Sequence, residues 1–220
     1  MGLNSVIFDL DGVLVFSDEY HYLAWKQIAE ELGVDFDKMK NNRLRGVSRM
    51  ESLEIVLEDY TGAPLGTEQK LELADKKNAI YRELLMNMKP SDVSDNVRYT
   101  LKELRKEGYR IAIGSSSKNS RFILEKVGLD DAFDAIADGT NITNSKPDPE
   151  VFLKAAEYLG TRPEDCLVVE DSESGINAAI AGGMKSAAIG DATKCENATY
   201  RINRLSDIVG ILGVENWIST

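Results

Sequence analysis

Two aspartates, Asp9 and Asp11, stand where an apolar run at 6–8 meets a glycine turn at Gly12. Neighbouring carboxylates repel each other, so the pair gains no stability from adjacency and needs an external reason such as a metal ion. Ligands bind in open α/β folds at the carboxyl ends of the strands, so this position predicts an active site. The first aspartate could act as a nucleophile and the second as a proton carrier.

Polar residues also follow two later apolar segments and precede one helix. Ser115 follows the segment 110–113, Lys146 stands directly before a helix signal, and the acidic pair 170–171 follows the segment 167–169. Together with the two aspartates, these pieces are typical of a site that transfers a phosphoryl group through an aspartyl phosphate.

Each piece has an expected role in that chemistry. Asp9 would attack phosphorus, while Asp11 would protonate the leaving oxygen and later activate the acceptor. Ser115 and Lys146 would hold the phosphate oxygens. Hard oxygen ligands beside a phosphate favour Mg²⁺, and the expected metal ligands are carboxylates from two segments: Asp9, Asp11, Glu170 and Asp171.

Short apolar segments alternate with helical patterns along most of the chain. The expected strands are rich in β-branched residues and cover 5–8, 110–113, 135–137, 167–169 and 186–189. Continuous apolar strands of this kind predict a parallel sheet covered by helices on both faces, which is a doubly wound α/β core.

The stretch between the first two expected strands is almost wholly helical in pattern. Helices are expected from Ser17 to Gly33, from Ser48 with a capping box, and over 67–86. This predicts an all-α cap domain at 17–87, inserted into a core domain made of residues 1–16 and 88–220.

Three helix boundaries are expected in the second part of the core. Asp148 should cap a helix whose first residue is Pro149, because proline suits the first helical position. Another helix should begin at Gly175, and a last one should lie near 205–212.

Composition and charge exclude several classes of partner. With 43% hydrophobic residues the chain can form a core, and its formal net charge of -11 disfavours nucleic acid and anionic membrane surfaces. No run approaches the ~18 apolar residues of a membrane span, and no basic segment precedes the first apolar run. Cys166 and Cys195 form no CxxC pair, so we expect a reduced, cytoplasmic chain. We also expect a monomer.

The ordered set of motifs resembles the haloacid dehalogenase superfamily, in the subgroup whose helical cap is inserted after the first strand. The resemblance covers the whole chain, and the order of the four motifs is more specific than the Asp-x-Asp pair alone. The dehalogenase branch of that superfamily lacks the second aspartate, which is kept here as Asp11. The resemblance therefore implies phosphoryl transfer.

A second phosphate would distinguish a mutase from a phosphatase. Lys146 suffices for one phosphate, whereas Arg49 in the cap and Lys118 beside Ser115 could bind another. In addition, the stretches 19–26, 46–49, 77–78 and 133–138 are similar to sugar-phosphate mutases of this superfamily. That resemblance implies interconversion of β-glucose 1-phosphate and glucose 6-phosphate through a sugar bisphosphate on an aspartyl-phosphate enzyme.

The same resemblance implies the residues that would contact the substrate. His21 and Lys77 would help to place Asp11 when the cap closes over the sugar. The remaining implied positions come from the cap and from the loop after the second strand: Trp25, Arg45, Gly46, Val47, Ser48, Arg49, Ser52, Ser116, Ser117, Lys118 and Asn119.

Simpler interpretations and other functions stay open. Arg49 and Lys118 could be ordinary surface cations, Trp25 could belong to the packing of the cap, and Ser48 caps a helix in any case. A sugar-phosphate or phosphoglycolate phosphatase of the same fold would release inorganic phosphate instead of isomerising the sugar. A signalling receiver domain would not need so large a helical insert, and a non-catalytic sensor would not need both Asp9 and Asp11.

Overall fold

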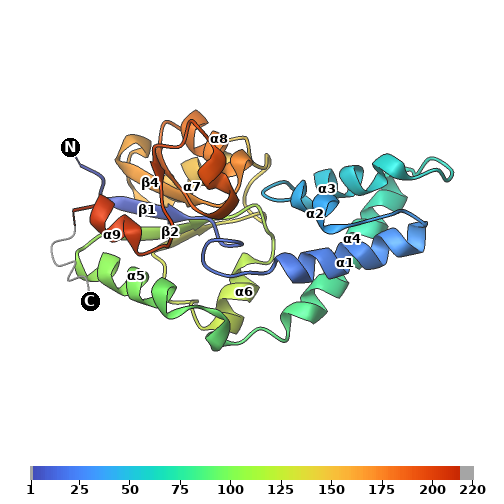
Figure 1. Cartoon of the computed structure of the whole chain (residues 1–220), viewed down its shortest axis with the longest axis horizontal. Helices are drawn as coiled ribbons and strands as arrows, with labels where there is room; N and C mark the ends of the chain where they lie inside the picture. The colour runs from blue at the N-terminus through green and yellow to red at the C-terminus, as the bar shows by residue number, and fades with distance from the viewer. Residues whose placement is uncertain (1, 214–220) are drawn as a thin grey trace.

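The computed structural model describes residues 2–213, and its centre is one parallel sheet of six strands (Figure 1). The strand order is β3-β2-β1-β4-β5-β6, so the chain winds outward on one side of β1 and then continues on the other. All five expected strands are present, and β6 is an additional two-residue edge strand. The bounds are β1 Ser5–Phe8, β2 Arg110–Gly114, β3 Ala135–Ala137, β4 Cys166–Glu170, β5 Lys185–Ala188 and β6 Tyr200–Arg201.

Helices cover both faces of the sheet, as expected from the continuous apolar strands. Alternate residues of β1 enter different cores, with Val6 and Phe8 on one face and Ile7 on the other. The first face is covered by α5 (Asp95–Lys106), α6 (Ser120–Val127) and α9 (Asp207–Ile211). The second is covered by α7 (Glu150–Leu159) and α8 (Glu173–Ala181), and together these layers confirm the doubly wound α/β class.

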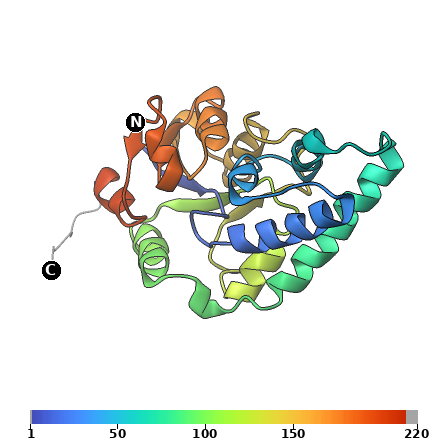
Figure 2. The same cartoon turned by 45° about the vertical axis from the view of Figure 1, so that its right-hand side comes forward.

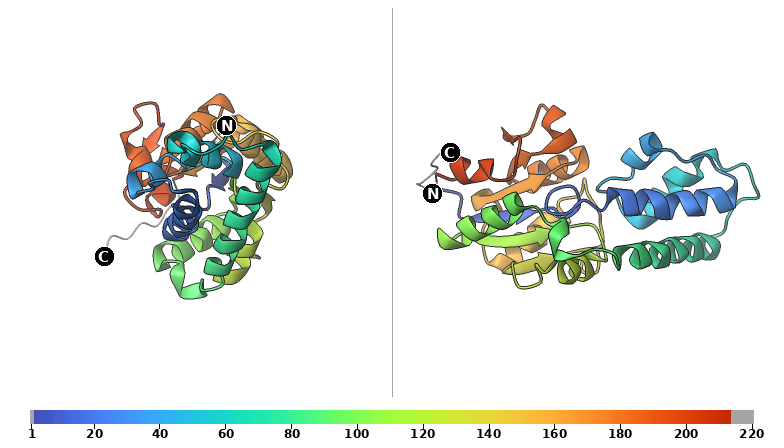
Figure 3. Two further views of the ribbon diagram at one scale, coloured as in Figure 1. Left: turned by 90° about the vertical axis from the view of Figure 1, so that its right-hand side faces the viewer. Right: turned by 60° about the horizontal axis from the view of Figure 1, so that its bottom comes forward.

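Between β1 and α5 the chain forms a separate helical unit, which we call the cap (Figures 2 and 3). Trp25, Ile28, Leu53 and Val56 form its own buried core. The cap stands beyond the carboxyl ends of the strands, over the loop that follows β1 (Figure 1). Its helices are α1 Asp18–Leu32, α2 Lys38–Asn42, α3 Arg49–Val56 and α4 Thr67–Leu85. The domain bounds 17–87 stay a prediction, and residues 214–220 of the expected core lie outside the described residues.

Short 3-10 turns complete the described elements at Leu57–Asp59, Pro90–Asp92, Pro163–Asp165 and Gly190–Lys194, the last of which we call η4. Within residues 2–213 no helix is both long enough and apolar enough to cross a membrane.

Several helix ends lie where the sequence predicted them, and two lie elsewhere. Ser48 caps α3 in a complete capping box, and Gly33 ends α1 with a left-handed φ of 68°. The expected start of α7 was one residue too early, because Asp148 accepts a hydrogen bond from the backbone of Glu150, the true first residue. The expected start of α8 at Gly175 was wrong, since that helix begins at Glu173.

The start of α8 lies before Gly175 because of the residue that caps the N-terminus of this helix. The Ser172 hydroxyl accepts the backbone N–H of Gly175 at 3.1 Å, which places Gly175 inside the first helical turn. The short helix α2 was not expected at all.

Candidate active site

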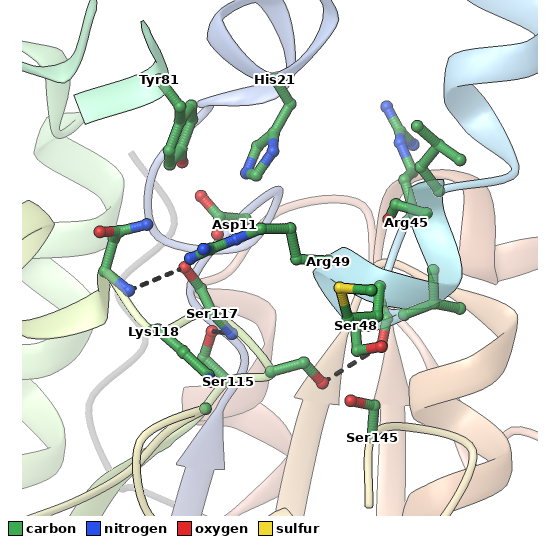
Figure 4. Close-up of a pocket in the computed structure, with 18 of the residues that line it drawn as sticks. Asp11, His21, Arg45, Ser48, Arg49, Tyr81, Ser115, Ser117, Lys118 and Ser145 are labelled. Atoms are coloured by element: carbon green, nitrogen blue, oxygen red, sulfur yellow. Dashed lines mark hydrogen bonds between the residues drawn. The ribbon is translucent and has the colours of Figure 1, made fainter. Parts of the chain in front are cut away.

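A cavity of about 470 Å³ lies between the cap and the carboxyl ends of the strands. Every residue expected in the site lines it except Lys146, which is fully buried behind the wall. In Figure 4, Arg49 reaches from the cap into the space that Ser115, Ser117 and Lys118 enter from the core. The ordered motifs of the core therefore do converge, and the expected cap residues face them from the other side of the cavity.

The loop after β1 is pressed against the loop after β4. Gly12 has a φ of +88°, and a Cβ placed on it would lie 2.0 Å from the Asp171 carboxylate. Only glycine therefore allows this approach, because a side chain would be both strained and in collision. Asp9 continues the sheet, with its backbone N–H donating to the Val169 carbonyl at 3.0 Å. The result is that Asp9 and Asp171 face the same corner of the cavity.

Lys146 joins two carboxylates from different strands. Its Nζ lies 2.5 Å from Asp9 Oδ1 and 2.5 Å from Glu170 Oε1. The second oxygen of Glu170 accepts the Ser172 backbone N–H and hydroxyl, each at 2.9 Å. Burial opposes the charge of Lys146, but Asp9 and Glu170 outweigh it and raise the pKa of the lysine above its usual value. Lys146 is therefore a buried cation directly behind Asp9.

Asp9 and Asp171, on the cavity side of this lysine, lack enough neighbouring positive charge to offset their burial. Burial is the main cause that raises the pKa of Asp9, with Glu170, Asp171 and Asp11 acting in the same direction and Lys146 against it. Burial and then Glu170 raise the pKa of Asp171 to about 8. A bound cation at this corner would reverse both shifts.

The expected set of four carboxylate ligands does not assemble as such. Among residues 2–213, no three His, Cys, Asp or Glu side chains gather closely enough to hold a metal ion. The reason at Glu170 is visible, since both of its oxygens already accept hydrogen bonds from Lys146 and Ser172. Mg²⁺ needs only one or two protein carboxylates and keeps several waters, so Asp9 and Asp171 fit this ion.

Asp11 is held by a residue that sequence reasoning missed. The hydroxyl of Ser17, itself fully buried, donates a hydrogen bond to Asp11 Oδ1. Burial raises the pKa of Asp11 to about 6, while the Ser17 hydrogen bond and the cations of Lys146 and Lys77 oppose the rise. The only sequence signal was a hydroxyl residue at the start of the cap.

Three cap residues, His21, Lys77 and Tyr81, contact one another near Asp11, and Figure 4 shows His21 and Tyr81 above that aspartate. Lys77 Nζ lies 2.9 Å from His21 Nδ1 and 4.4 Å from the centre of the Tyr81 ring. Burial lowers the pKa of Lys77 to about 7, and burial with the neighbouring Lys77 lowers the pKa of His21 well below its usual value. Tyr81 was missed by sequence reasoning, although it follows Lys77 by four residues on the same helix face.

The loop after β2 presents hydroxyl groups to the cavity. Ser115 Oγ accepts the Ser117 N–H and Ser117 Oγ accepts the Asn119 N–H, both at 3.1 Å. Lys118 is exposed at the rim of the same loop. Hydroxyls and a cation held in this way can bind phosphate oxygens.

Arg49 is tied to that loop across the cavity. Its guanidinium donates to Asn78 Oδ1 at 2.9 Å, and the same oxygen accepts the Asn119 side-chain amide at 2.9 Å. Asn78 lies in α4, so it connects a cap arginine with a core loop. Sequence reasoning did not assign Asn78 to the site, because only the folded arrangement brings these three residues together.

The cap segment 45–48 also lines the cavity and contacts the core. Ser116 Oγ donates to the Gly46 carbonyl at 3.2 Å, and a Cβ on Gly46 would lie 2.3 Å from Ser174 Oγ. Trp25 is 1% exposed and belongs to the cap core, but it also lines the cavity together with Val47 and Ser52. Both interpretations of Trp25 therefore describe part of its surroundings.

Comparison with known proteins places this fold and site in a family. A family model described as haloacid dehalogenase-like hydrolase matches residues 6–189. The chain belongs to that family.

Within it, the chain is 39% identical to a β-phosphoglucomutase of Bacillus subtilis (strain 168) over 98% of its length and 96% of the relative. A crystal structure of β-phosphoglucomutase from Clostridium difficile superposes with a TM-score of 0.88 at 33% identity, over 94% of this chain and 93% of the other. A phosphorylated-carbohydrate phosphatase of Thermotoga maritima is 29% identical over 83% of each chain. The resemblance to sugar-phosphate mutases of this superfamily is thus confirmed.

Proposed function

We propose that this enzyme isomerises β-glucose 1-phosphate to glucose 6-phosphate through β-glucose 1,6-bisphosphate. Similarity to β-phosphoglucomutases over nearly the whole chain carries the proposal. The cavity supports it, because positive charge is available from more than one residue. Lys146 lies behind Asp9, while Arg49 and Lys118 line the cavity itself. One phosphate could therefore react while the second is held.

The proposed reaction uses the two aspartates in turn. The phosphorylated carboxylate of Asp9 gives its phosphoryl group to the O6 hydroxyl of the sugar, and Asp11 takes the proton from that hydroxyl. The resulting bisphosphate turns around in the cavity. Asp9 then attacks the phosphorus on O1, and Asp11 returns its proton to the leaving O1. The products are glucose 6-phosphate and the phosphorylated enzyme, so atoms and charge balance over one turnover.

The cap residues would set the position of the proton carrier. Ser17 holds one oxygen of Asp11, and the pair of His21 and Lys77 fills the space above it. We propose that Asp9 and Asp171 hold Mg²⁺, which would offset the repulsion between an anionic nucleophile and an anionic phosphate. We also propose that the protein is cytoplasmic, in keeping with the two free cysteines at 166 and 195, and that it acts as a monomer.

One assay tests the proposed reaction against hydrolysis. The protein is incubated with Mg²⁺, β-glucose 1-phosphate and a trace of the bisphosphate, and glucose 6-phosphate and inorganic phosphate are followed together. We expect glucose 6-phosphate to accumulate far faster than phosphate. Rapid phosphate release with little isomerisation would instead identify a sugar-phosphate phosphatase, the activity of one relative at 29% identity.

The role of the second phosphate site is tested by Arg49→Ala. We expect this variant to lose about 10- to 100-fold in mutase kcat/KM, as for a charge-assisted contact worth about 1.5–3 kcal/mol. Hydrolysis of a small aryl phosphate, which has no second phosphate, should change little. Arg43→Ala is the matched control, because Arg43 pairs with Glu58 on the surface of the cap. Equal losses in both reactions would remove Arg49 from this role.

A further inference from the structure

The guanidinium of Arg45 lies among three carboxylates at the edge of the cavity. It pairs with Asp18 through Nη2, and its Nη1 lies 3.0 Å from Asp191 Oδ2 and 3.8 Å from Asp171 Oδ2. Figure 4 shows Arg45 on the cap, apart from the group around Asp11 and Arg49. Arg45 thus contacts both units of the molecule.

The carboxylates that surround Arg45 belong to different units. Asp18 begins α1 in the cap, so it moves with Arg45 and keeps the guanidinium aimed in one direction. Asp191 belongs to η4 in the core, where the exposed Lys194 donates to its other oxygen at 2.9 Å. The Arg45–Asp191 contact consequently exists only while the cap lies against the core.

Steric contact occurs at the same place. Ser174 Oγ in the first turn of α8 donates to the Arg45 carbonyl at 3.4 Å. A side chain at Gly46 would collide with that same hydroxyl, at 2.3 Å. The ion pair therefore lies beside the closest approach of the two backbones, where a small opening would break it.

We propose that Asp191 is a positioning residue that favours the closed cap by pairing with Arg45. The side chains of Arg45 and Asp191 are 27% and 60% exposed, so solvent screens the pair and its contribution is small. A weak contact suits this enzyme, because the cap must close to exclude water and open again to exchange or turn its ligand. We expect Asp191 to shift the ratio of closed to open protein by about two- to five-fold.

The position of the cap can be measured without any activity. Cysteines at the exposed positions Glu68 in the cap and Lys102 in the core carry spin labels, in a Cys195→Ser background. Asp191→Asn should raise the population at the longer distance about two- to five-fold. Asp191→Glu should restore most of the wild-type distribution. Screening with 0.5 M NaCl should have the same effect on the wild type as Asp191→Asn.

Two controls identify the partner. Lys194→Gln removes the contact within the core and should leave the distance distribution unchanged. In an Arg45→Gln background, Asp191→Asn should have no further effect, because its partner is already lost. The proposal is overturned if Asp191→Asn matches the wild type, or if its effect persists in the Arg45→Gln background.

A kinetic measurement gives an independent test and rests on the proposed function. Asp191→Asn should raise the KM for β-glucose 1-phosphate about two- to five-fold and leave kcat within a factor of about two, because the chemistry is unchanged once the cap is closed. Lys194→Gln should keep both constants. A loss confined to kcat would contradict the positioning role. If the protein were a phosphatase, the label distances would still answer the question about Asp191.

Discussion

At the scale of single residues, the site contains two buried lysines whose pKa values move in opposite directions. Lys146 is 0% exposed and Lys77 is 3% exposed, so burial opposes the charge of both. Lys146 has two carboxylates at 2.5 Å, and their attraction outweighs the loss of water. Burial lowers the pKa of Lys77 to about 7, and the like charge of Arg49 acts in the same direction, while its contact with His21 Nδ1 supplies no carboxylate to oppose them. The charged groups around each buried lysine therefore decide whether it stays protonated.

This difference gives a prediction for stability against pH. Lys77 has a pKa of about 7 in the folded protein against an ordinary 10.5, so between these values the unfolded chain binds more protons and stability must rise with pH. Below pH 7 the full cost of burying the charge is present. Lys77→Met removes that cost, and the variant should therefore be more stable than the wild type at pH 6, with an advantage that shrinks towards pH 10.

Urea unfolding at pH 6, 8 and 10 measures this dependence. Lys76→Met is the matched control, because Lys76 stands next in the same helix but makes an exposed ion pair with Glu31. Its effect should stay within about 0.5 kcal/mol at each pH. A Lys77→Met advantage that is the same at all three values would show that the buried amine does not titrate in this range.

At the scale of elements, the join between β4 and α8 depends on one glycine. A Cβ on Gly175 would lie 1.9 Å from the Glu170 carboxyl carbon. Glu170 has no free direction in which to move, because Lys146 and Ser172 hold both of its oxygens. The start of α8 and the buried ion pair of the site are therefore one structural feature.

Gly175→Ala should destabilise the protein although alanine is the better helix former. The gain in helix propensity is about 1 kcal/mol. Displacing Glu170 from Lys146 breaks a buried ion pair, which costs about 3–5 kcal/mol, so the loss dominates. Thermal unfolding should show a fall of roughly 10 °C. Gly210→Ala in α9 is the control, since a Cβ there meets nothing within 4 Å, and it should stabilise slightly.

The elements also show how far the sequence alone can predict this molecule. Hydrophobic periodicity and helix capping depend on residues close together in the sequence. The strand β1, the Ser48 capping box and the end of α1 at Gly33 were therefore predictable. The helix α2 and the strand β6 have five and two residues, too few for any period to be visible. The contact of Ser17 with Asp11 was not predictable because it lies within an irregular loop that has no period. The position of Asn78 between Arg49 and Asn119 was not predictable because those contacts join segments that only the fold brings together.

At the scale of the whole molecule, the cap and the core meet on two sides of the cavity. The segment 45–46 contacts α8 and η4 on one side. On the other, Arg82 donates to Asn119 Oδ1 at 3.2 Å, and Asn78 connects Asn119 with Arg49. A ligand between these contacts would touch both units. Its binding should therefore stabilise the closed molecule and not only one domain.

This arrangement predicts how ligand binding raises the unfolding temperature. With Mg²⁺ and glucose 6-phosphate at about 100 times its Kd, the wild type should gain about 2.7 kcal/mol, or roughly 5–10 °C. Arg49→Ala in the cap and Lys118→Ala in the core should each reduce the gain at the same ligand concentration, because both residues line the cavity and each would contribute one side of the proposed second-phosphate site. Lys126→Ala, on α6 beside Phe122, should leave the gain unchanged. If only Lys118→Ala reduced the gain, the phosphate would be bound by the core alone. The cap would then cover the sugar without holding its second phosphate, and the argument for a mutase from Arg49 would fail.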